Sequence, residues 1–364
     1  MWHAGHVGAR PTGDFVTAER NRNIDALRVV AAVGVLWSHS LNAFYSSYEW
    51  PRLLAGLILV GRAGVPFFFF AAGWAYSGSL ERHGNRALRR RVLQLAGIFA
   101  AAWLFSMAAG QPWSWWSTAG VRDILAAVFY GMPAGPLWFF PALIGATLVG
   151  HAIAGRGMTG AAAVLAWVAF LAGVIITALL PGIMGDKAAL LNPLTPGIVL
   201  YRTAVYWCGA YLTGMALAER GFAPDGRQTL ALVLAGVTGL AITLAMYLVP
   251  VALLPRWLAG SLTSIAVCVY SAGATSLGAA ALTPRSGRLV ELVAKAGPLA
   301  LWVYVVHPVV MTWLTRLFPT ASWGPWLYTL AVAAVSFAAA TVGLSAWRLL
   351  YSVAVHPTRP RTAP

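Results

Sequence analysis

Long apolar runs without a charged residue recur along this chain and limit what it can fold into. Residues 158–180, 229–252 and 327–347 contain no Asp, Glu, Lys or Arg. Each run is long enough to cross the hydrocarbon core of a bilayer as a helix, which takes about 20 residues. Only 10% of the residues are charged, whereas soluble domains carry roughly 25%. The sequence therefore predicts an all-α, polytopic membrane protein.

We expect about ten transmembrane helices in one transmembrane domain, residues 24–352, between an N-terminal tail (1–23) and a disordered C-terminal tail (353–364). Residues 113–130 are aromatic and amphipathic, which predicts an interfacial or partly re-entrant helix and not a full span. The 17 tryptophans, many near the ends of apolar runs, fit the aromatic belts of a membrane protein. The expected spans are 26–46, 55–80, 91–109, 135–153, 158–181, 198–218, 228–250, 258–281, 298–317 and 325–350.

The formal net charge of +15 raises the question of a nucleic-acid partner. With the N-terminus inside, most of the 25 Lys and Arg residues fall in segments on the cytoplasmic side. This is the distribution that the positive-inside rule describes. We therefore expect both termini in the cytoplasm, a location in a cell membrane (the bacterial inner membrane), contact with membrane lipids and no nucleic-acid partner. The first 23 residues are polar and Gly-rich, so no cleavable signal peptide is expected.

The first apolar run carries three ionisable residues, Asp25, Arg28 and His39. Spacings of 3 and 14 residues place all three near one face of a helix, with His39 about 21 Å from Asp25 along the axis. Ionisable groups at membrane depth are costly and commonly functional. Asp25 alone could instead favour the helix N-terminus electrostatically, and His39 could be a buried histidine bound to a carbonyl.

A second intramembrane histidine, His307, precedes Pro308 in "LWVYVVHPVV". The proline removes a backbone hydrogen bond and leaves a carbonyl free near the imidazole. Two histidines at membrane depth, far apart in sequence, could meet in one cavity. Because histidine is the usual general base near neutral pH, such a pair favours catalysis.

Five arginines lie between 82 and 91, directly after the second apolar run. One interpretation is orientation together with binding of anionic lipid head groups. The other is a cytoplasmic site for a phosphate-bearing donor, formed by Arg86, Arg89, Arg90 and Arg91. Arg62 is assigned to the same donor site. It lies with Gly64 and Pro66 in a run that we expect to be a broken or closely packed helix lining a cavity.

No metal site is expected. The two cysteines, Cys208 and Cys268, lie inside apolar runs and outside any Cys/His cluster. The same placement argues against a disulfide framework.

Taken in order, these segments resemble the acyltransferase-3 family of integral-membrane O-acyltransferases. The resemblance lies in "RNIDALRVVAAVGVLWSHS", "GVPFFFFAAGW", "RALRRRVLQL" and "LWVYVVHPVV", with "PLWFFPAL" as a weaker match. The sequence departs from the family pattern at Pro66 and Ala72, where Asp and Ser are frequent, and has no glutamate after Trp138.

The resemblance implies O-acyl transfer, commonly of acetyl from acetyl-CoA, to a hydroxyl of a sugar, a cell-surface glycan or a related metabolite. It implies that Arg86, Arg89, Arg90 and Arg91 hold the phosphates of CoA, and that Asp25 and Arg28 order the donor. His39 would be the base or the acyl carrier. His307 would be a second base or would orient the acceptor.

Two other functions stay open at this point. A secondary transporter or flippase could use His39 and His307 as a proton relay. Against it, the sequence has no visible inverted repeat, and the arginine cluster suits an anionic cofactor better. A passive scaffold would tolerate substitution of both histidines.

Overall fold

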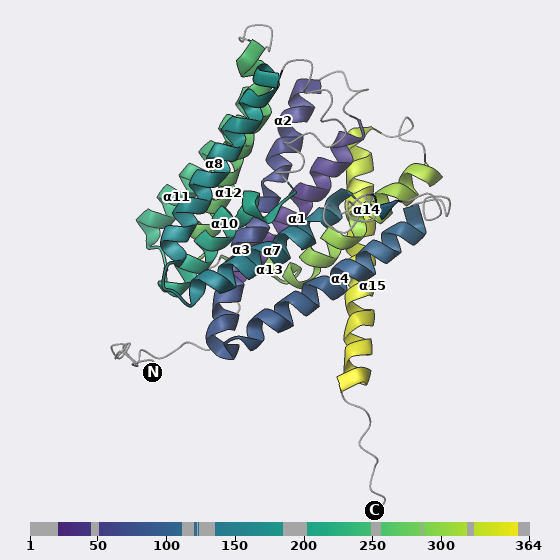
Figure 1. Cartoon of the computed structure of the whole chain (residues 1–364). Helices are drawn as coiled ribbons and strands as arrows, with labels where there is room; N and C mark the ends of the chain where they lie inside the picture. The colour runs from purple at the N-terminus through teal and green to yellow at the C-terminus, as the bar shows by residue number, and fades with distance from the viewer. Residues whose placement is uncertain are drawn as a thin grey trace, which may run out of the picture.

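The structure is a computed structural model that describes residues 21–44, 51–110, 120–121, 123, 135–184, 202–248, 256–284, 287–318 and 324–355. These residues form helices, with no strand among them, which confirms the all-α class (Figure 1). The elements are α1 (Arg22–Asn42), α2 (Pro51–Arg62), α3 (Gly64–His83), α4 (Arg86–Gly110), the short 3-10 helix η1 (Gly135–Trp138), α7 (Phe139–Ala154), α8 (Thr159–Met184), α10 (Ala204–Glu219), α11 (Gly226–Leu248), α12 (Arg256–Ala280), α13 (Arg288–Ala294), the 3-10 helix η4 (Gly297–Leu299), α14 (Ala300–Leu317) and α15 (Pro325–Val355).

Helix α1 begins with a side-chain cap and occupies the middle of the bundle. The Asn21 side chain accepts the backbone N–H of Ile24 at 3.1 Å, so Asn21 and not Asp25 caps the helix. Along its length α1 packs against α2, α3, α13, α14 and α15. Its ionisable residues are therefore held among neighbouring helices.

The second apolar run is broken, as its glycines and proline predict. It forms α2 and α3, which meet at Ala63. Close packing on α1 accompanies the break: a Cβ at Gly61 would lie 3.1 Å from the Cβ of Ser38 and within contact of the Gly34 carbonyl. Small residues allow helix backbones to approach this closely inside a membrane.

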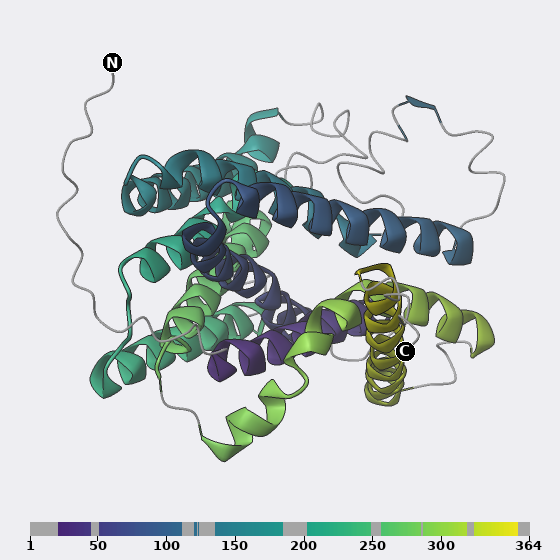
Figure 2. The same cartoon turned by 90° about the horizontal axis from the view of Figure 1, so that it is seen from below.

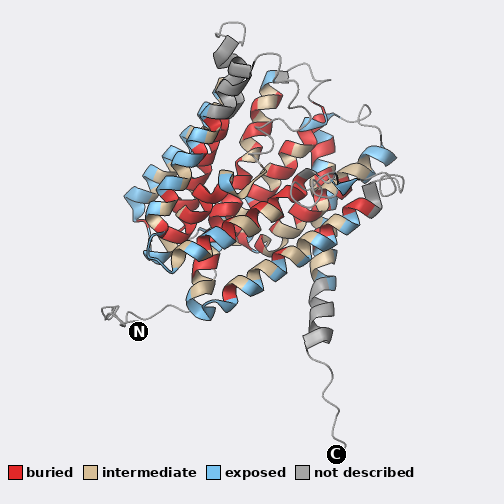
Figure 3. Ribbon diagram, viewed as in Figure 1, coloured by how far each residue is buried: buried red, intermediate tan, exposed pale blue. Residues whose placement is uncertain are grey.

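Helices α3 and α10 cross at the centre through two further glycines. A Cβ at Gly73 would collide with the backbone carbonyl of Tyr211, and one at Gly214 with that of Phe70. Buried residues gather around this crossing, where α1 and α7 also lie (Figure 3). This closely packed centre fixes the positions of the helices that carry the site.

The outer helices expose apolar side chains, as expected for contact with lipid. On α8 and α11 the exposed residues include Leu165, Val168, Leu230 and Leu234, on the flank opposite α15 (Figures 1 and 3). Six segments of the described chain are long and apolar enough to cross a membrane: 22–42, 52–83, 136–154, 226–248, 288–317 and 325–346. The total of ten spans and the cytoplasmic location of both termini stay predictions.

Several expected features fall outside the described residues. They are most of the interfacial helix at 113–130, the N-terminal tail up to residue 20 and the C-terminal tail from residue 356.

Candidate active site

The two intramembrane histidines lie side by side. His39 is in the last turn of α1 and His307 is near the middle of α14, and their ring centroids are 5.3 Å apart with an interplanar angle of 49°. Both face a cavity of about 470 Å³. We call it the histidine cavity; its lining includes His39, His307, Pro136, Met311, Thr312 and Arg316.

The backbone fixes the orientation of His307 and the tautomer of its neutral ring. Its Nδ1 lies 2.8 Å from the carbonyl oxygen of Tyr304 and 3.3 Å from that of Val303. A carbonyl only accepts hydrogen bonds, so Nδ1 carries the hydrogen and donates. In an uninterrupted helix the Tyr304 carbonyl would accept the N–H of residue 308, which is a proline here. Pro308 therefore makes this carbonyl available to the imidazole.

With Nδ1 donating, Nε2 of neutral His307 is left with a lone pair. The residue is fully buried, and Nε2 has no hydrogen-bond partner in the described part of the chain. An unpaired buried polar atom costs about 1–3 kcal/mol and calls for an explanation. The geometry fits a nitrogen that accepts a proton or a hydrogen bond from a ligand.

The segment "PLWFFPAL" contributes Pro136 to the lining of this site. The hydroxyl of Tyr304 donates to the Pro136 carbonyl at 2.7 Å, and its ring centroid lies 5.0 Å from that of Phe139 and 5.9 Å from that of Phe68. Tyr304 therefore supports His307 through its carbonyl and η1 through its hydroxyl. The sequence alone indicates only an interfacial anchor at 135–143 and assigns no role to Tyr304.

One arginine lies at the histidines: Arg316 lines the histidine cavity. Arg62 ends α2, which packs on α1. The sequence predicts that Arg62 belongs to the donor site with the arginines of α4. The 20 residues of α3 separate it from them, which is about 30 Å at 1.5 Å per residue.

The opposite end of α1 carries an ion pair. Asp25 is 4% exposed, and Arg28 Nη1 lies 3.3 Å from its Oδ1. The two residues are three apart on one helix, as their spacing predicts. The carboxylate is buried, whereas the guanidinium is partly exposed.

One arginine of the predicted donor cluster is partly buried. Arg91 Nη1 donates to Gln94 Oε1 at 3.5 Å, and burial lowers the pKa of Arg91, with smaller electrostatic effects of Tyr211 and Arg28. Arg86, Arg89 and Arg90 are exposed. Seen from below, α4 runs across the bundle while α15 is viewed along its axis (Figure 2). We call Asp25, Arg28, Arg91 and Tyr211 the donor-side cluster. Its two guanidiniums outnumber its single carboxylate.

Polar contacts that the sequence did not reveal surround the donor-side cluster. Tyr211 donates to Thr147 Oγ1 at 3.2 Å, and the Tyr76 hydroxyl lies 2.9 Å from His151 Nδ1. The centroids of the Tyr76 and Tyr211 rings are 6.5 Å apart. In the sequence His151 marked only a helix end. No spacing rule relates residues on α3, α7 and α10, so this network could not be predicted.

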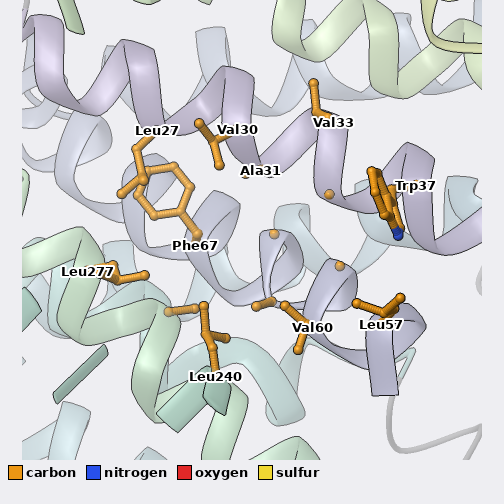
Figure 4. A pocket seen from close by; sticks show the side chains of 15 residues that line it. Leu27, Val30, Ala31, Val33, Trp37, Leu57, Val60, Phe67, Leu240 and Leu277 are labelled. Atoms are coloured by element: carbon orange, nitrogen blue, oxygen red, sulfur yellow. The ribbon is translucent and has the colours of Figure 1, made fainter. Parts of the chain in front are cut away.

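A second cavity, of about 340 Å³, is apolar and lies on the other side of α1 (Figure 4). Its lining includes Leu27, Ala31, Gly34 and Trp37 of α1 and Gly61 and Phe67 from the broken run. At 100° per residue Gly34 and Trp37 fall opposite Asp25, Arg28 and His39 on α1. This cavity has the position expected for the broken helix, but none of the described residues that line it is titratable.

Metal ligands are not clustered in the described part of the chain. No group of three or more His, Cys, Asp or Glu residues there could hold an ion. Cys208 and Cys268 are free cysteines.

A family model described as an acyltransferase domain matches residues 21–344, which include both histidines and all the arginines named above. The chain belongs to the acyltransferase-3 family. Comparisons with curated proteins and with solved structures found no match. As a member of the acyltransferase-3 family with six apolar helices long enough to span a bilayer, the chain is a multi-pass membrane acyltransferase. The histidine cavity and the donor-side cluster are therefore candidate parts of one acyl-transfer site.

Proposed function

We propose that this acyltransferase moves an acyl group, commonly acetyl, from acetyl-CoA to a hydroxyl of a sugar, a cell-surface glycan or a related metabolite. The observation that carries the proposal is the meeting of His39 and His307 in one cavity, with the Nε2 lone pair of His307 unpaired. Acyl transfer to a hydroxyl needs a base of this kind.

The donor is assigned to the other end of α1. Arg28 and Arg91 provide guanidinium groups for the phosphates of CoA, and the exposed Arg86, Arg89 and Arg90 extend this positive charge to the surface. From Asp25 to His39 the helix rises about 21 Å. The pantetheine arm of CoA is the part of the donor that would cover this distance and bring the thioester to the histidines.

The reaction has a simple balance. The acceptor oxygen attacks the thioester carbonyl carbon, an imidazole nitrogen takes the hydroxyl proton, and the C–S bond breaks. The proton then passes to the departing thiolate, which leaves CoA with a free thiol. Either imidazole can supply this nitrogen. If His39 first carries the acyl group, His307 would be the base for the acceptor in the second step.

Isotope-labelled acetyl-CoA added to membranes that contain the protein tests the proposal. Wild-type protein should transfer label to a hydroxyl-bearing product, and His39→Ala should lose this transfer while CoA still raises its melting temperature. Label retained on wild-type protein after rapid denaturation, and absent from His39→Ala, would identify a carrier. Transfer at the wild-type rate by His39→Ala would refute the assignment of His39.

The same measurement separates an acyltransferase from a transporter that uses the histidines as a proton relay. A transporter should not be stabilised by micromolar to millimolar CoA and should form no labelled product. Family membership favours the acyltransferase.

A further inference from the structure

The histidine cavity follows two neighbouring rows of side chains on α14. Exposure increases along them: His307 is fully buried, Thr312 is half-buried, and the last residue of each row is exposed. The cavity therefore leads from the surface near the end of α14 to the buried imidazole, and a molecule that follows it passes Thr312. At intervals of three or four residues, which keep side chains on one side of a helix, the rows are His307, Met311 and Thr315, and Pro308, Thr312 and Arg316.

Thr312 uses its hydroxyl hydrogen within its own helix. Its Oγ1 donates to the carbonyl oxygen of Pro308 at 2.9 Å. A hydroxyl oxygen also has two lone pairs that can accept hydrogen bonds. No donor from the described part of the chain bonds to them. Thr312 can therefore accept a hydrogen bond from a ligand in the cavity, but its own proton is already engaged.

The other threonine of the cavity is tied to a neighbouring helix. Thr315 Oγ1 donates to the Met311 carbonyl at 2.8 Å and lies 3.0 Å from the hydroxyl oxygen of Tyr328 on α15. Thr315 thus joins α14 to α15. Of these two threonines, Thr312 is the one whose lone pairs are left for a ligand.

The cavity therefore contains two hydrogen-bond acceptors that lack donors within the described residues. One is Thr312 Oγ1, and the other is the Nε2 lone pair of His307. Five residues separate them on α14, which is about 7.5 Å along the helix axis. Two acceptors at this spacing suit one small molecule that brings two hydroxyl groups.

We propose that Thr312 positions the acyl acceptor by accepting a hydrogen bond from a second hydroxyl of the same molecule, while the hydroxyl that is acylated donates to an imidazole. The inference rests on the proposed O-acyl transfer, and it adds a specificity-determining residue and an acceptor with at least two hydroxyl groups. The second hydroxyl takes no part in bond making, so its hydrogen bond contributes equally to the bound acceptor and to the transition state. Loss of such a bond raises KM and leaves kcat unchanged.

A purely structural role of Thr312 would have other consequences. A threonine that bonds to the carbonyl four residues earlier can bend its helix. Removing the hydroxyl would then displace His307 and change every reaction of the site, including the transfer of acetyl to water. Water has no second hydroxyl, so the proposed role of Thr312 does not affect that reaction.

The first test measures labelled acetyl transfer to a dilution series of a lipid and glycan extract of the source cells. Thr312→Val keeps the shape of the side chain without the hydroxyl. It should raise the KM for the extract by about threefold to tenfold, the worth of one neutral hydrogen bond, with kcat retained. Thr312→Ser restores a hydroxyl and should have the wild-type KM. The matched control is Thr341→Val, an exposed position on α15 with the same bond, to the Phe337 carbonyl, which should also behave as wild type.

The second measurement is the release of CoA thiol from acetyl-CoA without extract. Thr312→Val should release thiol at the wild-type rate. A wild-type KM for Thr312→Val would overturn the inference, and so would an equal fall of thiol release and of transfer to the extract.

Stabilisation by CoA shows that Thr312→Val is folded. If it is not, Thr312→Ala also lacks the hydroxyl and should give the same increase in KM. Failure of the proposed function has a different signature, because wild-type protein would then label no product with any extract.

Discussion

His307 owes its orientation to the residue that follows it. Because Pro308 has no N–H, the Tyr304 carbonyl is free to accept the imidazole Nδ1–H at 2.8 Å, which leaves Nε2 as the lone-pair nitrogen in the buried site. Proline after a mid-span histidine was sufficient to predict a free carbonyl nearby. The Tyr304 hydroxyl bond to Pro136 was not predictable, because it joins α14 to η1 across the fold.

Replacing His307 by Asn tests whether the lone pair matters. Asn keeps an N–H donor for the Tyr304 carbonyl but has no basic nitrogen, so the helix should be preserved while proton transfer is lost. We expect labelled acetyl transfer to fall by about 10²- to 10⁴-fold, with CoA-dependent thermal stabilisation unchanged. The exposed His83, replaced by Gln, is the control and should retain the wild-type rate. Normal transfer by His307→Asn would leave His307 only a structural role.

At the scale of elements, close glycine contacts decide which helices neighbour each other. The sequence predicted a closely packed second run, and Gly61 and Gly73 both lie where a neighbouring helix approaches. It did not identify the partners, α1 for Gly61 and α10 for Gly73, because contacts between distant segments leave no periodic pattern. The same limit applies to the Tyr76–His151 contact between α3 and α7.

Gly73→Ala should weaken the crossing of α3 and α10. The new Cβ would collide with the Tyr211 backbone, which cannot rotate away, so we expect a loss of about 1–3 kcal/mol or more. The matched control is Gly97→Ala in α4, where a Cβ meets nothing within 4 Å and where alanine should stabilise the helix by up to about 1 kcal/mol. Thermal unfolding of both variants in detergent gives the comparison. A Gly73→Ala variant as stable as wild type would show that α3 and α10 do not cross this closely.

At the scale of the whole molecule, length, low charge and apolar runs were sufficient to predict the helical membrane class, and four short patterns were sufficient to indicate the family. The spacing of Asp25, Arg28 and His39 also placed them near one side of α1. Residue spacing alone did not predict that Arg62 and Arg86 lie far apart. Their distance depends on α3 continuing unbroken between them, with Arg62 at the histidine end.

Sidedness follows from the path along α1. If the donor arrives from the cytoplasm, the α3–α4 turn near Arg86 faces inside and the start of α15 faces outside, since these lie at opposite ends of the molecule (Figure 1).

Cysteine labelling tests this orientation. In a background with both native cysteines replaced by alanine, we introduce Asn85→Cys or Gly324→Cys, each at an exposed position. A membrane-impermeant maleimide applied to intact cells should label the cysteine at 324 and spare the one at 85, with the reverse in inside-out vesicles. Labelling of both positions from one side would contradict this topology. Labelling of 85 from outside and of 324 from inside would invert the orientation and place the CoA arginines away from their cytoplasmic donor.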